Sequence, residues 1–394
     1  MKLKIAAYYP YLYLRSGIER TILEILKRST HDWTIFTNRY EAESTYPELS
    51  RFNDKIVELK RISVKRSYCN TLRSAHVIFN QTLPMENYDI LWVHNEGLGS
   101  LINFKNSLVP CICFCHTPLK IVYDERLIKD YLLRNSIKAL PYFLFSSLFK
   151  YIDKKAFRLY DWCFCVSEEV KRRIIKNKLF SEDKVEVIYR GVDTKVLNGA
   201  NVYGNYFFHP TRIKWWKNIE LSIEAFIAFQ HSHREFSGFK LIIAGELYHD
   251  ENNSYYETLK KLTRTNKDIE FIINPTEAQI IDLYQNCRAV LSTTLNEDFG
   301  LTVLESFSFS KPVIAINRGG PREIIRHQHT GFLSSEDKNE FASYMYAFAK
   351  DKDIAKAMGV KGRHDILKYD WDDVIRYIDS FLENFIHNDR KHKA

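Results

Sequence analysis

The sequence has no hydrophobic run long enough to cross a bilayer. Its best candidate, residues 131–149, is interrupted by Arg134, Lys138 and Pro141. It leaves about 11 uninterrupted apolar residues, whereas a spanning helix needs about 20. The first ten residues form a strand pattern and not the charged, apolar and cleavable pattern of a secretion signal. We therefore expect a cytoplasmic protein, and peripheral binding to the cytoplasmic face of the membrane is left open.

Cysteine is too scarce and too regularly placed for a disulfide framework or a zinc site. The count is seven, an odd number, and Cys111, Cys113 and Cys115 alternate along one strand pattern. Side chains at alternate positions project from the same face of a strand, so these three do not converge tetrahedrally on a zinc ion. We interpret them, with Cys163 and Cys165, as small apolar core residues in a reducing compartment.

Several familiar catalytic motifs are also missing. The sequence contains no G-x-S-x-G, no G-x-x-x-x-G-K-[ST] and no H-E-x-x-H. No Asp-x-Asp pair follows a predicted strand, where it could hold a divalent metal. These absences argue against a serine hydrolase, a P-loop enzyme and a zinc peptidase. We expect a site that uses no metal and no cofactor.

Positive charge is concentrated in the first half of the chain. Residues 1–190 contain 31 Lys and Arg against 21 Asp and Glu, a net of +10, whereas the whole chain has a formal charge of +8. Segment 120–158 contains nine basic and four acidic residues around the apolar run 139–149. One interpretation is a solvated basic face, and the other is a surface for anionic lipid or a diphosphate-bearing acceptor. Nucleic acid is not expected, because no binding motif accompanies the charge.

Length and pattern predict two α/β domains. The 394 residues are too many for one ordinary core. Strand-length apolar runs alternate with helical patterns in both halves, which predicts parallel sheets covered by helices on both faces. Expected strands of the first half are 3–8, 33–37, 90–93, 111–115, 163–166 and 185–189, with helices such as 18–28 and 152–160. Those of the second half are 206–209, 240–244, 269–273, 289–292 and 312–316, with helices 219–230, 254–263 and 277–286 and one from Thr302.

The boundary between the domains is predicted in the glycine-containing segment 191–204, which has no apolar periodicity. The first domain then covers 1–192 and the second 203–366. A last amphipathic helix is expected at about 370–387, followed by a polar, frayed tail from Asn388.

The most informative motif lies between a predicted strand and a predicted helix. After strand 289–292 come Asn296-Glu297-Asp298-Phe299-Gly300-Leu301-Thr302-Val303-Leu304-Glu305. Open parallel sheets bind ligands at the carboxyl ends of their strands. Main-chain N–H groups near Gly300, Leu301 and Thr302 would begin a helix and suit an anion, while Glu297 and Glu305 would suit sugar hydroxyls. This combination predicts a nucleotide-sugar site.

Other strand ends carry residues that fit the same ligand. Arg212 and Lys217 follow strand 206–209 and would offer a diphosphate a planar fork and a point charge. Ser16 and Gly17 follow the first strand, and His116 follows strand 111–115. Each of these features alone is more often structural than functional. Together they gain weight, because each lies at a strand end.

These residues resemble retaining glycosyltransferases of family 4, which have the GT-B architecture of two Rossmann-like, doubly wound domains facing across a cleft. The stretch Glu297 to Glu305, followed by Ser310-Lys311-Pro312-Val313-Ile314-Ala315 and Gly319-Gly320, resembles the family's E-x7-E signature. Arg212 and Lys217 resemble its diphosphate-binding pair. Ser16-Gly17-Ile18-Glu19-Arg20 is similar to its glycine-rich loop, with Ser16 where the family usually has a first glycine. The surroundings of His116 resemble the bacterial mannosyltransferase branch.

The resemblance implies roles for these residues. Glu305 would hold the ribose hydroxyls of the donor, and Glu297 would face the transferred sugar. Arg212 and Lys217 would stabilise the leaving diphosphate in place of a metal, and His116 would contact the sugar from the other domain. Ser16 and Gly17 would also lie near the donor. Main-chain groups of Asp298, Phe299, Gly300, Leu301 and Thr302 would complete the donor site.

The expected activity is transfer of a hexosyl group, with mannose as the first choice, from a GDP- or UDP-linked sugar to a glycan acceptor that is free or lipid-linked. Two alternatives are kept. A nucleotide-sugar epimerase of the same architecture would transfer nothing, and a catalytically silent protein would only bind sugar.

Overall fold

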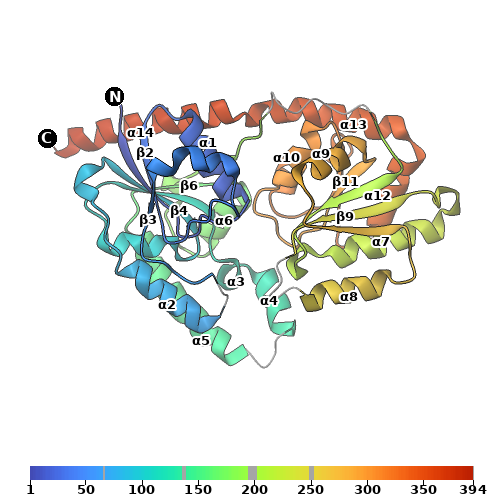
Figure 1. Ribbon diagram of the computed structural model, residues 1–394, viewed down its shortest axis with the longest axis horizontal. Helices are drawn as coiled ribbons and strands as arrows, with labels where there is room; N and C mark the ends of the chain where they lie inside the picture. Colours follow the sequence, from blue (N-terminus) through green and yellow to red (C-terminus); the bar gives the residue numbers. More distant parts are fainter. Residues whose placement is uncertain (65–66, 135–138, 194–201, 248–252, 394) are drawn as a thin grey trace. The chain divides into compact units, whose positions relative to one another are not determined.

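The computed structural model describes residues 1–64, 67–134, 139–193, 202–247 and 253–393, and these fall into two compact units. Unit 1 comprises Met1–Arg190 with Trp371–Ala394, and unit 2 comprises Gly191–Asp370. Each unit contains one parallel sheet with flanking helices (Figure 1). The predicted fold of two Rossmann-like units is therefore confirmed, and the cleft expected between them stays a prediction. Much of the predicted boundary, residues 194–201, lies outside the described residues.

The sheet of unit 1 has the strand order β3-β2-β1-β4-β5-β6-β7, and every neighbouring pair is parallel. The chain starts in the middle, builds toward one edge and then returns to build toward the other. Its elements are β1 (Lys4–Tyr8), α1 (Gly17–Arg28), β2 (Asp32–Thr37), η1 (Pro47–Lys55), β3 (Ile56–Glu58), α2 (Tyr68–Phe79), η2 (Met85–Asn87), β4 (Ile90–Glu96), η3 (Leu98–Lys105), β5 (Cys111–Thr117), α3 (Lys120–Tyr123), α4 (Glu125–Arg134), α5 (Ala139–Phe157), β6 (Trp162–Cys165), α6 (Glu168–Lys176), η5 (Glu182–Lys184), β7 (Val185–Val187) and α14 (Trp371–Lys393).

Unit 1 has a sheet that is buried on both faces, as parallel sheets usually are. Trp92 of β4 is fully buried, and its ring meets those of Trp33 and Phe114 edge-on at 5.6 and 5.5 Å. Every residue of β5 is buried, so Cys111, Cys113 and Cys115 are apolar core residues, as predicted. All seven cysteines of the chain are free thiols.

The sheet of unit 2 has the order β10-β9-β8-β11-β12-β13 and is also parallel throughout. Its elements are β8 (Tyr206–Pro210), η6 (Trp215–Lys217), α7 (Ile219–Ser232), η7 (Arg234–Phe236), β9 (Lys240–Gly245), α8 (Asn253–Thr263), β10 (Ile269–Ile273), α9 (Glu277–Asn286), β11 (Ala289–Ser292), α10 (Leu301–Ser308), β12 (Val313–Ile316), α11 (Pro321–Ile324), β13 (Gly331–Ser334), α12 (Lys338–Lys350), α13 (Lys352–Asp365) and η8 (Ile366–Tyr369).

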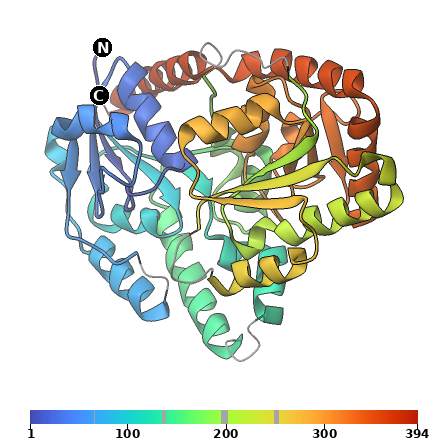
Figure 2. The same ribbon diagram turned by 45° about the vertical axis from the view of Figure 1, so that its right-hand side comes forward.

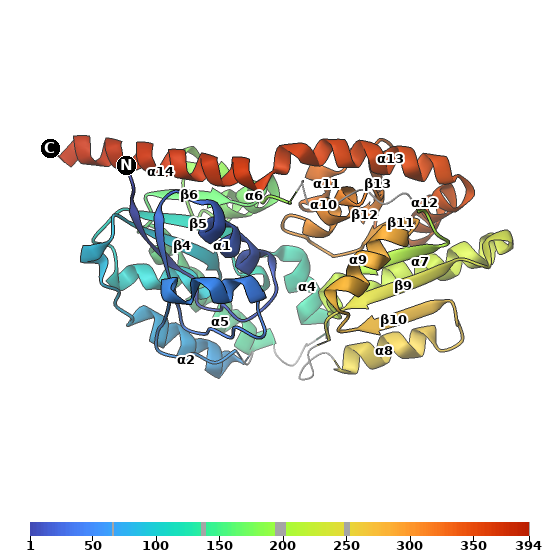
Figure 3. The same ribbon diagram turned by 45° about the horizontal axis from the view of Figure 1, so that its top comes forward.

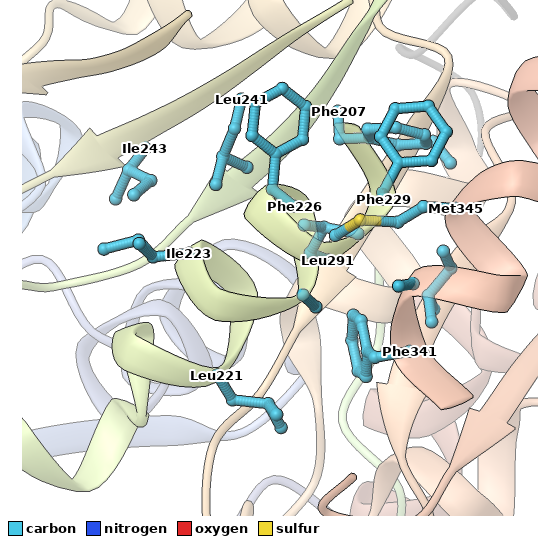
Figure 4. Packing of buried hydrophobic residues seen from close by; sticks show 14 of the residues in the cluster. Phe207, Leu221, Ile223, Phe226, Phe229, Leu241, Ile243, Leu291, Phe341 and Met345 are labelled. Carbon is cyan, nitrogen blue, oxygen red and sulfur yellow. The ribbon is translucent and has the colours of Figure 1, made fainter. Parts of the chain in front are cut away.

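The core of unit 2 is rich in phenylalanine and joins the sheet to two helices. Phe207 of β8 packs against Phe229 of α7, with ring centroids 5.8 Å apart and nearly perpendicular planes. Figure 4 shows Phe341 and Met345 of α12 entering the same cluster beside Phe226 and Leu291. Burial of several aromatic side chains on one face of the sheet fixes α7, which follows the β8 loop of the site described below.

The structure differs from the sequence expectations in several elements. Helix α5 begins at Ala139, whereas the sequence pattern predicted a helix only from residue 152. Its first turns were not predicted because they are apolar on all sides and lack an amphipathic period. Strands β3 and β13 were not predicted and have only three and four residues. The tail expected to fray from Asn388 continues the helix α14 to Lys393.

Helix α14 is held in unit 1 by an apolar stripe and by one buried carboxylate. Ile375, Ile378 and Leu382 are each at most 1% exposed, and α14 lies beside α1 (Figure 2). The Asp379 carboxylate accepts hydrogen bonds from Ser29 Oγ at 2.6 Å, Thr30 N at 2.7 Å and Thr30 Oγ1 at 2.9 Å. The amphipathic helix predicted at 370–387 thus joins the unit built from the first half of the chain.

We expect Asp379→Ala to lower the free energy of unfolding of unit 1 by about 1.5 to 2 kcal/mol, because the donors of the half-buried Ser29 and of Thr30 lose a charged acceptor. Urea unfolding followed by tryptophan fluorescence measures this. The matched control is Asp373→Ala on the same helix, which removes only an exposed ion pair with Arg376 and should cost below about 1 kcal/mol. Equal losses in the two variants would contradict the role given to Asp379.

Candidate functional site

Two loops of unit 2 leave the sheet side by side. Strands β8 and β11 are hydrogen-bonded neighbours although β9 and β10 lie between them in the chain. The strand order reverses between β8 and β11, and such a switch point is where open parallel sheets bind ligands. Arg212 and Lys217 lie in the loop after β8, and residues 293–300 form the loop after β11.

These two loops are hydrogen-bonded to each other, with the loop after β11 donating to main-chain carbonyls of the loop after β8. Thr293 Oγ1 donates to the Lys217 carbonyl at 2.9 Å, and the Leu295 amide donates to the Trp216 carbonyl at 3.1 Å. Asn218, at the start of α7, has left-handed backbone angles (φ 49°, ψ 49°) that turn the chain into the helix. Lys217 is therefore held against the loop that contains Glu297.

Lys217 and Glu297 form a half-buried ion pair. Lys217 Nζ lies 2.8 Å from Glu297 Oε2, and the two side chains are 16% and 25% exposed. Within the ranges that the structure describes, the Arg212 guanidinium takes part in no ion pair. An anion that approaches these loops therefore meets a positive charge at Arg212 that no carboxylate in the described ranges offsets.

Helix α10 begins without a side-chain cap. Its N-cap residue Gly300 has φ +103° and ψ 50°, a left-handed conformation that glycine adopts readily, and no side chain in the described ranges caps the first amides. Phe299 is buried, whereas Leu301 and Thr302 are half-buried. The first N–H groups of an uncapped helix are hydrogen-bond donors for an anion.

Glu305 lies one turn into α10 and is exposed. Its Oε2 accepts a hydrogen bond from the Tyr284 hydroxyl at 2.9 Å. Tyr284 is buried and stacks on Phe309 with ring centroids 5.1 Å apart, and burial followed by the charge of Glu305 raises the pKa of its phenol. Tyr284 therefore stays a donor and orients the exposed carboxylate of Glu305.

The glycine pair after β12 supports the Glu297 loop. A Cβ atom on Gly320 would lie 2.0 Å from the Phe299 carbonyl oxygen, and one on Gly319 would lie 2.1 Å from that of Glu297. The Gly320 amide donates to the Glu297 carbonyl at 2.9 Å. Only glycines allow this approach, so Gly319 and Gly320 position the loop from outside the E-x7-E stretch.

His209, also near this point, has a structural role. It is 1% exposed, and its Nδ1 bonds to Ser222 Oγ at 2.9 Å, while Ser222 donates to the Ile219 carbonyl at 2.8 Å. The Ser222 hydroxyl therefore accepts, and His209 carries its proton on Nδ1. Burial, with Lys217 nearby, lowers the pKa of His209 to about 3, so the ring is neutral and adds no charge to the site.

In unit 1, the Ser16–Gly17 turn starts α1 at the switch point between β1 and β4. Ser16 caps the helix by accepting from the Ile18 amide at 3.4 Å, and its hydroxyl also bonds to the buried carboxyl of Glu19. Burial raises the pKa of Glu19 to about 7, against a smaller lowering by Ser16. Ser16 is thus engaged by its own helix, and contact of Ser16 or Gly17 with a donor stays a prediction.

His116 lies at the end of β5, as predicted, but both ring nitrogens are engaged inside unit 1. Arg190 Nη2 lies 2.5 Å from His116 Nδ1, and His116 Nε2 lies 2.9 Å from His94 Nδ1. A guanidinium can only donate, so Nδ1 accepts and Nε2 carries the proton toward His94. Burial, then Arg190 and His94, lowers the pKa of His116. In this arrangement neither nitrogen is open to a sugar.

The structure thus brings Arg212, Lys217, Glu297 and the start of α10 together at one switch point, with Glu305 on the same helix. Sequence reasoning missed Tyr284, His94 and Arg190, which orient predicted residues from other elements. Arg190 could have been noticed as a cation just after a strand, whereas Tyr284 lies in an ordinary helix pattern. In the described ranges, no group of three or more His, Cys, Asp and Glu residues is placed to hold a metal ion.

Two family descriptions match this chain in succession. Residues 15–196 match Glycosyltransferase Family 4, and residues 196–365 match Glycosyl transferases group 1. The Arg212–Lys217 pair, the Glu297–Glu305 stretch and the glycine pair all lie in the second match.

Similar curated proteins include mannosyltransferases. The human alpha-1,3/1,6-mannosyltransferase ALG2 is 34% identical over 155 residues, which is 37% of this chain and 37% of that protein. The match therefore spans well under half the length of this relative. An uncharacterized glycosyltransferase of Methanocaldococcus jannaschii is 25% identical over 371 residues, 93% of each chain.

Solved structures share the fold across nearly the whole chain. HepE of Anabaena, in complex with UDP and glucose, has a TM-score of 0.73 at 16% identity and covers 97% of this chain and 99% of its own. Sucrose-phosphate synthase of Thermosynechococcus elongatus has a TM-score of 0.75 at 14% identity and covers 98% and 100%. At these identities the likeness concerns the fold.

We expect Gly320→Ala to lower the stability of unit 2 by about 1 to 3 kcal/mol, because the new methyl group must displace the loop at Phe299. The backbone angles of Gly320 (φ −59°, ψ −35°) suit alanine, so the close contact alone causes the loss. The matched control is Gly238→Ala, where a Cβ atom would meet nothing within 4 Å. Thermal unfolding of both variants measures the effect, and an unchanged midpoint for Gly320→Ala would refute the close approach.

Proposed function

We propose, since this chain belongs to the family 4-like glycosyltransferases, that it transfers a mannosyl group from a nucleotide sugar to a saccharide acceptor with retention of the anomeric configuration. One observation carries the proposal. Two cationic side chains and an uncapped helix start lie on neighbouring loops at the switch point of unit 2, which is the chemistry that a diphosphate requires.

The diphosphate is proposed to bind Arg212, Lys217 and the first amides of α10. Arg212 has no ion pair in the described ranges, so its charge is available to the ligand. As the bond between sugar and phosphate breaks, negative charge grows on the leaving diphosphate, and fixed donors stabilise that charge most in the transition state. These residues take the part that a divalent metal plays in other transferases.

Glu297 is proposed to act on the transferred sugar while it is paired with Lys217. The 2.8 Å contact fixes the direction of the carboxylate, and a bound diphosphate would share the same ammonium group. Glu305 is proposed to accept hydrogen bonds from the ribose of the donor, because its carboxylate is exposed and already held by Tyr284.

Mannose is supported by the relatives, not by the geometry. Several similar proteins are alpha-1,3/1,6-mannosyltransferases, and we propose GDP-mannose as the donor on that ground. UDP-hexoses are the alternative. The acceptor is proposed to be a growing glycan, with a lipid-linked saccharide favoured by the excess of basic residues in the first half of the chain.

A front-face mechanism accounts for retention. No described side chain of the site is proposed as a covalent nucleophile, so the leaving phosphate oxygen would itself accept the proton of the attacking acceptor hydroxyl. Arg212 and Lys217 would hold that oxygen in position through the step.

The decisive experiment is a calorimetric panel of GDP- and UDP-sugars against the full chain, followed by product analysis with and without acceptor saccharide. A transferase turns over quickly only when acceptor is present and yields an α-linked product. An epimerase would release an altered sugar without acceptor, and a silent protein would bind donor and leave it intact. Either result would refute the proposed transfer.

Glu305→Ala is expected to weaken nucleotide binding about tenfold, because one charged acceptor of the ribose hydroxyls is lost. Glu297→Ala should leave nucleotide affinity within about threefold and lower kcat by about a hundredfold or more. Calorimetry with the free nucleotide and steady-state kinetics separate the two effects. Equal behaviour of the variants in both measurements would overturn the assigned roles.

We expect activity to survive an excess of chelator, because the cationic groups of the proposed phosphate site are covalently part of the chain. Initial rates before and after extensive dialysis against a chelator test this. Complete loss that manganese restores would show that the diphosphate needs a metal, and the roles of Arg212 and Lys217 would then have to be reassigned.

A further inference from the structure

The solvent-facing side of α5 is mostly apolar, with Ser147 as an exposed polar residue on it. Leu140, Phe143, Leu144, Leu148 and Tyr151 are between 51% and 70% exposed. Their spacing of three and four residues places them on one face of the helix. The opposite face, which includes Tyr142, Phe149 and Ala156, is buried in unit 1. A helix at the surface of a globular protein normally turns a polar face to water.

The apolar face of α5 continues onto α2. The two helices lie side by side in unit 1 (Figures 1 and 3), and Tyr68 of α2 packs on Phe145 of α5 with ring centroids 5.3 Å apart. A shallow groove between them is lined by Leu72, Phe145 and Leu148 among others, and Leu72 is itself 50% exposed. We call the set Leu72, Leu140, Phe143, Leu144, Leu148 and Tyr151 the α2–α5 surface. Contiguous exposed apolar side chains of this kind mark a binding site.

Positive charge borders the α2–α5 surface, and negative charge is missing from the exposed side of α5. Lys155 on the same face and Arg158 just past the end of α5 are exposed, and Lys155 Nζ lies 4.4 Å from the centre of the Tyr151 ring. Arg73 is exposed next to Leu72. The one acidic residue of α5, Asp153, is buried and accepts a hydrogen bond from Tyr123 at 2.9 Å.

We propose that the α2–α5 surface docks unit 1 on an anionic lipid bilayer. The leucine and aromatic side chains would enter the boundary of headgroups and acyl chains, while Lys155, Arg158 and Arg73 would meet lipid phosphates. A second copy of the chain is disfavoured as occupant, because pairing this surface with itself would bring the same cations together. None of the helices in the described ranges has the length and apolar character of a membrane span.

The inference deepens the proposed function and rests on it in one respect, because a lipid-linked acceptor is what would make such contact useful. Binding to vesicles, however, is measured without donor, acceptor or turnover. Vesicle binding without transfer would leave this inference standing and refute the proposed function, whereas transfer to a water-soluble saccharide without vesicle binding would do the reverse.

The test is flotation of the full chain with phosphatidylcholine vesicles that contain or lack phosphatidylglycerol. We expect binding to the anionic vesicles, weakened by salt. The double substitution Leu144→Asp with Leu148→Asp should lower it by about tenfold or more, because a carboxylate cannot enter the apolar boundary. The pair Lys155→Glu with Arg158→Glu should lower binding to anionic vesicles and leave any weak binding to neutral vesicles unchanged.

The matched control is Val360→Asp on α13 of unit 2, which is 53% exposed and lies outside the α2–α5 surface. It should bind vesicles as the unaltered chain does. The four residues changed in the two double variants, Leu144, Leu148, Lys155 and Arg158, are all exposed. We therefore expect both variants to keep the thermal midpoint of the unaltered chain and its transfer to a soluble saccharide acceptor. Three results would overturn the inference: no binding of the unaltered chain, equal binding of the leucine variant, or a lipid-free dimer that the leucine variant abolishes.

Discussion

The parallel pairing of β8 with β11 is the constraint on which the site of unit 2 depends. Phe207 pairs with Ala289 and Phe208 with Val290, although about eighty residues separate them in the chain. Because these two strands are neighbours, the loop with Lys217 meets the loop with Glu297, and Thr293 Oγ1 and the Leu295 amide donate hydrogen bonds across to it. The phenylalanine core below the sheet fixes both strands, so packing far from the ligand sets the distance between the charges.

Charge balance then decides what this arrangement attracts. Glu297 offsets Lys217, whereas Arg212 and the start of α10 are not offset by a described side chain. A site with one balanced pair and one remaining cation favours a diphosphate over a neutral sugar. His209 does not change this balance, because burial and the neighbouring Lys217 keep its ring neutral.

The strand ends that form the site of unit 2 were predictable because, at each of them, a strand-length apolar run gives way to a helical pattern and charged residues or glycines lie between the two. The alternation of apolar runs and helical patterns gave the two sheets, and the strands at 269–273 and 289–292 coincide with β10 and β11. Long-range partners were not predictable. Nothing near His116 in the sequence indicates that Arg190 and His94 take both of its nitrogens, and Tyr284 looks like any helical tyrosine. The roles of these residues in binding remain predictions.

The first turns of α5 escaped prediction for the same physical reason that suggests their role, which is that their exposed face is apolar. Amphipathic period reveals a helix only when one face is polar, and the first turns of α5 are apolar toward both the core and the solvent. A sequence pattern of this kind is hard to distinguish from a buried strand or a short apolar loop. Exposing several leucine and phenylalanine side chains to water costs free energy in the isolated protein. This cost would be offset by a partner that is apolar within and anionic at its edge, because lysine and arginine border the surface and α5 has no exposed acidic residue.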